Sequence, residues 1–282
     1  MSDLHVTTLG AGQPVVFVHG SFVRGGASWY AQRALADGYR LHFVDRRGFG
    51  GSPEAPGGED FDRDAGDIAE LLGDGSHLVG SSYGAVVSLL AAGLRPDAVR
   101  SLTVIEPPAF SYAPDSPEAT AMRQRVAAVM AVADRLEPEA FYPAFLSAMG
   151  YDLETLGLTA WEQVCTGPRA PSVREMRTSM FQRPPWDAAL PLDTIAGAPF
   201  PRLVVAGGWD TATPATRAST GAALQAVCDV IARRIGAEQA VIAGALHAPQ
   251  SARPAAFNAR LRTFLAAAGD GAPVARAAWS DA

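Results

Sequence analysis

The chain has 282 residues, of which 48% are apolar and 18% charged, and its formal net charge at pH 7 is −6. This length suits one large domain with an insertion, and the acidic charge balance argues against nucleic-acid binding, which needs a basic face. All 23 basic residues are Arg, so chemistry that requires Lys is excluded, namely Schiff-base catalysis, pyridoxal enzymes and the phosphate-binding P-loop.

The sequence carries no pattern typical of a metal site, a cofactor site or a membrane segment. Cys165 and Cys228 lie outside any Cys-x-x-Cys or Cys/His cluster, so we expect ordinary thiols. The N-terminus lacks the basic and apolar regions of a signal peptide, and no apolar run reaches the roughly 18 residues of a membrane span. We therefore expect a cytoplasmic protein with a small-molecule substrate and no nucleic-acid or membrane partner, with monomer and homodimer both open.

Apolar runs alternate with helical segments along the first third of the chain. The segments 27–36 and 60–72 have helical character, and a short apolar run beginning at His77 leads into a further helix that extends to Ala92. An alternation of about one strand every 30 to 40 residues predicts a mostly parallel sheet covered by helices on both faces. Strand-like runs cover 4–9, 15–18, 41–44 and 99–105.

The turn Gly80-Ser81-Ser82-Tyr83-Gly84 lies between a predicted strand and a predicted helix. Its small residues let the backbone turn sharply, which pushes Ser82 outward in a strained conformation. Gly-x-Ser-x-Gly in this context resembles the nucleophile elbow of the α/β-hydrolase family. For the five residues alone, a plain Ser/Gly turn before a helix is the alternative.

Two earlier loops are similar to segments of the same family. His19-Gly20-Ser21-Phe22 resembles the loop that supplies a backbone N–H to the oxyanion hole, a role that would fall to Ser21 or Phe22, with Tyr83 as the second donor. Residues 45–53 are similar to the family's D-x-R-G-x-G-x-S segment, which shapes a loop near the site. Neither loop has the spacing of a phosphate or dinucleotide site.

From Pro108 to about Leu190 the strand pattern gives way to helical periodicity. This segment resembles the helical cap that many α/β-hydrolases insert between core strands. We therefore expect a core formed by residues 1–107 and 191–282 and a cap formed by 108–190. Met130 and Phe145 are candidates for the substrate pocket, although at any single position a Met or an aromatic residue more often serves simple packing.

The family's acid and base have counterparts in the last third of the chain. Asp210 follows the strand-like run from Arg202 in a G-x-x-D-x-x-x-P region that resembles the loop of the triad acid, and His247 lies in a loop after the last short strand. Ser82, Asp210 and His247 follow the family's order of Ser, acid and His. Glu106 is the alternative acid. Some members of the family place the triad acid after the strand that precedes the cap, which is where Glu106 lies.

The resemblance implies an α/β-hydrolase fold and serine chemistry. His247 would accept the proton of Ser82, and Asp210 would fix the imidazole tautomer. A Ser nucleophile argues against haloalkane dehalogenases and epoxide hydrolases, which use Asp. We expect a small, hydrophobic carboxylic ester or lactone to be hydrolysed through an acyl-enzyme. A C–C bond hydrolase of a diketone-like substrate, a perhydrolase and a non-catalytic ligand-binding scaffold remain alternatives.

Overall fold

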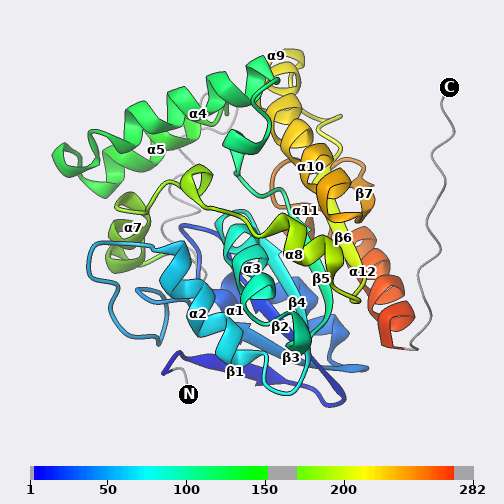
Figure 1. The fold of residues 1–282 in the computed structure, drawn as a ribbon. Helices are drawn as coiled ribbons and strands as arrows, with labels where there is room; N and C mark the ends of the chain where they lie inside the picture. Colours follow the sequence, from blue (N-terminus) through cyan, green and yellow to red (C-terminus); the bar gives the residue numbers. More distant parts are fainter. Residues whose placement is uncertain (1–2, 152–169, 270–282) are drawn as a thin grey trace, which may run out of the picture.

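The computed structural model describes residues 3–151 and 170–269, and within these residues the sheet has seven strands (Figure 1). Their order across the sheet is β1-β3-β2-β4-β5-β6-β7, and only the pairing of β1 with β3 is antiparallel among these strands. The predicted α/β architecture with a mostly parallel sheet is confirmed. The strands are β1 (Val6–Leu9), β2 (Gln13–Val18), β3 (Tyr39–Val44), β4 (Ser76–Ser81), β5 (Val99–Ile105), β6 (Arg202–Gly207) and β7 (Glu238–Ile242).

Helices cover both faces of the sheet because its central strands are apolar on both sides. In β2, Val16 and Val18 belong to one core cluster, while Val15 and Phe17 belong to the other. The first cluster is covered by α2 (Phe61–Leu71), α3 (Tyr83–Leu94), α8 (Leu192–Gly197) and α10 (Ala222–Ile235). The second is covered by the short 3-10 helix Tyr30–Leu35 and by α12 (Pro254–Gly269).

The segment predicted as a helix at 27–36 differs in detail. It forms the short α1 (Gly25–Ser28) followed by the 3-10 helix, with Trp29 buried between them. A Cβ at Gly25 would collide with the carbonyl group of Val44, so the close approach of α1 to the end of β3 requires glycine at this position.

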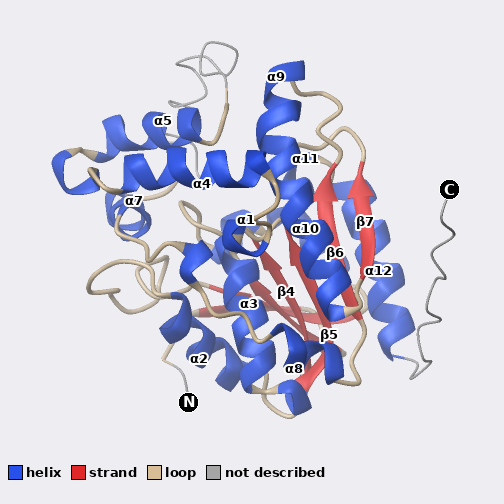
Figure 2. Cartoon of the chain, turned by 45° about the horizontal axis from the view of Figure 1, so that its top comes forward, coloured by secondary structure: helices blue, strands red, loops and turns tan. Residues whose placement is uncertain are grey.

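The chain between β5 and β6 carries helices that lie beyond the carboxyl ends of the central strands (Figure 2). This position matters for function because ligands of open parallel sheets bind at that edge. The division into a core of residues 1–107 and 191–282 and a cap of residues 108–190 stays a prediction. The helices are α4 (Pro117–Met130), α5 (Pro138–Ala148) and α7 (Val173–Met180).

Two further sequence predictions concern single features of the chain. In the described residues Cys228 is a buried free thiol, whereas Cys165 lies outside them. Within those same residues no helix combines the length and the apolar character needed to cross a bilayer.

Candidate active site

Ser82 stands at the turn between β4 and α3 with φ +54° and ψ −123°, a conformation that side-chain-bearing residues rarely adopt. Glycines on either side make this turn possible. A Cβ at Gly80 would collide with Ser88 and Gly84, and one at Gly84 would collide with the carbonyl of His19. The backbone N–H of Ser82 donates to the carbonyl of Ile105 at 2.8 Å, which ties the turn to the end of β5.

Glu106 is the carboxylate that orients His247. The distance between Glu106 Oε2 and His247 Nδ1 is 2.7 Å, and the Glu106 side chain is fully buried. Its other oxygen, Oε1, accepts hydrogen bonds at 2.9 Å from the backbone N–H of Gly207 and from Trp209 Nε1. Because the carboxylate accepts a hydrogen bond from the Nδ1–H group, the proton of the neutral imidazole stays on Nδ1 and the lone pair is on Nε2, which is the state a general base requires.

We expected Asp210 to orient His247, and the structure corrects this expectation. Asp210 is exposed, and its Oδ1 accepts a hydrogen bond at 2.7 Å from the backbone N–H of Gly244. That hydrogen bond, ahead of the nearby Arg charges, lowers the pKa of the Asp210 carboxyl. Asp210 points outward because of the turn at the preceding residue, Trp209, which has a φ of +53°. The Trp209 indole turns inward and donates to Glu106, while Asp210 lies at the surface.

The predicted oxyanion loop packs directly against Ser82. A Cβ added to Gly20 would lie 3.0 Å from Ser82 Cβ, so only glycine lets the two segments approach this closely. The His19 ring holds the loop from behind, with Nδ1 2.7 Å from the Gly20 carbonyl and Nε2 accepting from the Arg46 backbone N–H at 3.0 Å. Burial and the Arg46 charge lower the pKa of His19 well below its usual value, so the ring is neutral.

The three predicted oxyanion donors are not equivalent. The backbone N–H of Phe22 donates to Ser179 Oγ at 2.8 Å, so it is already engaged with α7. Phe22 also has a positive φ of +64°. Ser21 and Tyr83 both line the cavity described below, and they are therefore the remaining candidates for stabilising a negatively charged oxygen.

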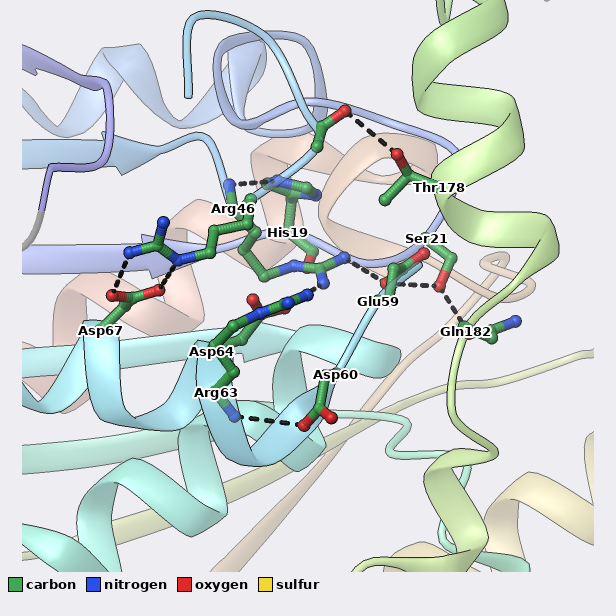
Figure 3. Close-up of polar contacts among 12 residues, drawn as sticks. His19, Ser21, Arg46, Glu59, Asp60, Arg63, Asp64, Asp67, Thr178 and Gln182 are labelled. Atoms are coloured by element: carbon green, nitrogen blue, oxygen red, sulfur yellow. Dashed lines mark hydrogen bonds and ion pairs between the residues drawn. The ribbon is translucent and has the colours of Figure 1, made fainter. Parts of the chain in front are cut away.

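A buried ionic cluster supports this loop (Figure 3). The Arg46 guanidinium is fully buried and pairs with Glu59 Oε2 at 2.7 Å and with Asp64 Oδ2 at 2.8 Å. It also donates to the carbonyls of His19 and Gly20, both at 3.0 Å. Burial, partly offset by Arg46, raises the pKa of Asp64 to about 6. The Arg-containing loop after β3 therefore fixes the loop predicted to form the oxyanion hole.

Ser82 and His247 open into a cavity of about 500 Å³. Most of its wall consists of apolar and aromatic side chains from the segment between β5 and β6. Phe145 lines the cavity as expected, but Met130 is not among its lining residues; it packs behind the wall, against the cluster that contains Phe141 and Met176. The wall includes Val126, Tyr142, Phe145, Met149, Tyr151 and Trp186.

Sequence reasoning missed Trp209, Ser179 and Glu59 as contributors to the site. Each acts through a contact with a distant segment: Trp209 holds Glu106, Ser179 holds Phe22, and Glu59 holds Arg46. No sequence spacing connects these partners, and the only available signal was the position of Trp209 beside the predicted acid.

The comparisons with known proteins agree with this fold. Residues 13–152 match the model of the alpha/beta hydrolase fold family. The chain is 44% identical over 72 residues to a putative non-heme chloroperoxidase of Synechocystis sp., covering 25% of this chain and 26% of that protein. It is 36% identical over 107 residues to a pimeloyl-[acyl-carrier protein] methyl ester esterase of Chromobacterium violaceum, covering 36% and 40%.

These matches span only about a quarter to two fifths of the length of the curated relatives. A solved structure extends the likeness to nearly the whole chain. A thermophilic esterase from Thermogutta terrifontis is 25% identical, with a TM-score of 0.60, and the match covers 94% of this chain and 93% of that one.

Proposed function

The chain belongs to the α/β-hydrolase superfamily, and from this premise we propose that it is a serine hydrolase that cleaves a small, hydrophobic carboxylic ester or lactone. The observation that carries the proposal is the hydrogen bond between Glu106 and His247, since His247 lines the same cavity as Ser82, which stands on its strained turn. A buried carboxylate that fixes the imidazole in its basic tautomer is an arrangement suited to activating a hydroxyl nucleophile.

In the proposed mechanism His247 Nε2 takes the proton of Ser82 as Oγ attacks the carbonyl carbon. The backbone N–H groups of Ser21 and Tyr83 stabilise the resulting oxyanion, and the positive end of α3 adds to this field. His247 then gives its proton to the leaving alcohol, which leaves an acyl group on Ser82. Water, deprotonated by His247, hydrolyses that ester and restores the enzyme. Glu106 stabilises the imidazolium that forms in both halves of the reaction.

The substrate class rests on the cavity and on the relatives. A volume of about 500 Å³ is in the range of sites for small ligands, and the apolar wall favours a hydrophobic acyl or ring group. Relatives named as esterases support ester cleavage. We also infer that residues 108–190 act as a cap, since this segment supplies most of the wall. Perhydrolysis, in which hydrogen peroxide replaces water in the second step, is a second candidate because of the chloroperoxidase relative.

The test is active-site labelling followed by a substrate panel. A fluorophosphonate probe is expected to modify Ser82, as located by mass spectrometry, and Ser82→Ala should abolish the label. The panel comprises p-nitrophenyl esters from acetate to decanoate, with wild type and Ser82→Ala compared at equal concentrations. A label on Ser81, or no labelled serine together with no ester turnover, would contradict the proposal.

A further inference from the structure

A buried glutamine lies between the loop that carries His247 and the strand that leads to Ser82. Gln250 is 2% exposed, and its Nε2 donates to Ser81 Oγ at 3.0 Å. Ser81 is the last residue of β4 and immediately precedes Ser82. Gln250 belongs to the short α11 (Pro249–Ala252), which follows the loop of His247. One side-chain hydrogen bond therefore joins the segment of the proposed base to the segment of the proposed nucleophile.

The loop is also held on the side that faces β6. The backbone N–H of Trp209 donates to the carbonyl of Ala245 at 2.9 Å. A Cβ added to Gly207 would lie 2.4 Å from the carbonyl oxygen of Leu246, so the loop rests directly on the end of β6. Backbone contacts therefore anchor the chain before His247, and the side-chain contact described above anchors it afterwards.

Between these two anchors the chain passes through a strained residue. Ala248 has a φ of +65°, a left-handed conformation that costs stability in a residue with a side chain. Such a conformation persists only where the surrounding contacts determine it. Gln250 lies just beyond this residue. Loss of its hydrogen bond would therefore let the turn relax and allow His247 to shift.

A second buried glutamine holds the same short helix from outside. Gln32, on the 3-10 helix Tyr30–Leu35, is fully buried, and its Nε2 donates at 2.9 Å both to the Gln250 carbonyl and to Asn258 Oδ1. A buried amide is costly unless it is hydrogen-bonded, whereas Met fills a similar volume without that cost. Packing alone therefore does not account for an amide at position 250, but the contact with Ser81 does.

Glu106 and Gln250 constrain His247 in different ways. Glu106 binds Nδ1, which fixes the direction of the imidazole and its tautomer. This contact at one ring atom does not set how far Nε2 lies from Ser82, because the loop that carries the ring could still shift. Ser81 is paired with β5 and stays fixed relative to the turn that follows it. The link from Gln250 to Ser81 supplies the second constraint.

We propose that Gln250 is a positioning residue which, through its hydrogen bond to Ser81, sets the separation between His247 Nε2 and Ser82 Oγ for proton transfer. Neither Gln250 nor Ser81 is among the described residues that line the cavity, so neither is expected to touch the substrate. The inference rests on the proposed hydrolase function, since it concerns the geometry of that same catalytic pair.

The experiment is a double-mutant cycle on Gln250 and Ser81. Gln250→Met nearly conserves volume and removes the donor, while Ser81→Ala removes the acceptor. Steady-state kcat and KM are measured on the best p-nitrophenyl ester. Each single variant should lower kcat by about tenfold or more, since a misplacement of about 1 Å can cost on the order of 100-fold. KM should change by less than about threefold, because the contact acts on the reacting groups and not on substrate binding.

The double variant distinguishes positioning from two separate packing effects. If both side chains act through one hydrogen bond, the double variant should match the slower single variant within about twofold, whereas independent losses would multiply to about 100-fold or more. The rate of fluorophosphonate labelling at Ser82 should fall in parallel. Rates are expressed per folded enzyme, as judged by circular dichroism. The control is Gln225→Met, on α10, where Gln225 donates to Asp229 at 2.7 Å; its kcat should equal that of the wild type.

The outcomes separate this inference from the proposed function. An active wild type whose two single variants keep kcat within about twofold overturns the inference alone, and so do losses that multiply in the double variant or that are confined to KM. If Gln250→Met does not fold, Gln250→Ala, which adds no bulk, takes its place under the same criteria. A wild type that is neither labelled at Ser82 nor able to turn over an ester overturns the proposed function, and the inference with it.

Discussion

Both carboxylate oxygens of Glu106 face donors that the fold holds in place. One oxygen faces His247, and the other receives the Gly207 N–H and the Trp209 indole N–H. The carboxylate therefore cannot rotate without breaking two hydrogen bonds in a buried site, where unpaired polar groups are costly. This fixes the direction of the imidazole as well as its tautomer.

Replacing Glu106 with Gln should lower kcat on the scale of about 10⁴-fold, as expected when an amide replaces the orienting carboxylate of a triad. The amide oxygen would stay with Gly207 and Trp209, so its NH₂ would face His247 Nδ1 and force the proton onto Nε2.

Asp210→Asn should change kcat by less than about fivefold, since Asn Oδ1 can still accept from Gly244. Steady-state rates on the best p-nitrophenyl ester decide between them, and a severe Asp210→Asn effect beside a mild Glu106→Gln effect would reinstate Asp210.

The choice between these two acids lay beyond the reach of the sequence for a specific reason. β5 and β6 are parallel neighbours with Ile105 opposite Val205, so the residues that follow them arrive at the same edge of the sheet. Both Glu106 and Asp210 were therefore plausible partners for His247. The left-handed backbone at Trp209 decides between them. A sequence indicates such a conformation only when the residue is Gly or Asn, and a Trp gives no sign of it. Ser82 was predictable because its neighbours Gly80 and Gly84 reveal the turn.

At the scale of elements, α4 and α5 place two predicted pocket residues in different environments. Both were chosen from helical periodicity, which identifies an inward face but not what that face contacts. Phe145 on α5 lines the cavity, whereas Met130 at the end of α4 packs behind it. The difference depends on how the helices cross each other and the sheet, which is a matter of tertiary packing that a single-helix pattern cannot contain.

Phe145→Ala should enlarge the cavity and shift the preferred acyl length towards longer chains, measured as kcat/KM from acetate to decanoate. Met130→Ala is the matched comparison. Met130 is only partly buried, so its loss should lower the free energy of unfolding by about 2 kcal/mol or less while the preferred chain length stays the same. An unchanged chain-length profile in Phe145→Ala, with the fold intact, would contradict the assignment of α5 to the substrate wall.

For the whole molecule, His77 couples stability to pH. It lies in β4, with Nδ1 2.7 Å from Ser101 Oγ and Nε2 2.9 Å from Gln13 Oε1. Burial, assisted by the charge of Arg100, lowers the pKa of His77 to about 4. An unfolded chain would protonate this histidine near pH 6.5. The unfolded state therefore binds the proton first as the pH falls, and stability is lost between about pH 6.5 and pH 4.

We expect His77 to account for about 2 kcal/mol of the stability lost between pH 7 and pH 5. His77→Gln should remove that share, so urea unfolding of the variant should depend less on pH than unfolding of the wild type. Asp64, whose pKa is raised to about 6 by burial, acts in the opposite direction, because its stability contribution falls as pH rises through about 4 to 6. Both proteins contain Asp64, so their difference isolates His77; equal pH dependence would refute its role.

The sequence was sufficient for the architecture because strand-like apolar runs alternate with helical segments both before and after the helical stretch 108–190, and many weak local signals agree. It was insufficient where one contact decides the outcome. The buried cluster of Arg46, Glu59 and Asp64 illustrates this, because a charged residue in a loop or at a helix start is usually exposed and nothing local in the sequence indicates that these three are buried together.

The left-handed backbone around the site has a consequence for evolution. Among the described residues, the non-glycine positions with positive φ are Phe22, Ser82, Glu106, Trp209 and Ala248, the last being the neighbour of His247. Each such residue lowers the free energy of unfolding by roughly 1 kcal/mol or more, so together the five lower it by on the order of 5 kcal/mol. The net stability of a fold is typically about 5–15 kcal/mol. Selection for thermal resistance alone, without a test of activity, would therefore favour glycine at these five positions. In lineages that no longer need catalysis, we expect substitutions of the site to occur first at these positions.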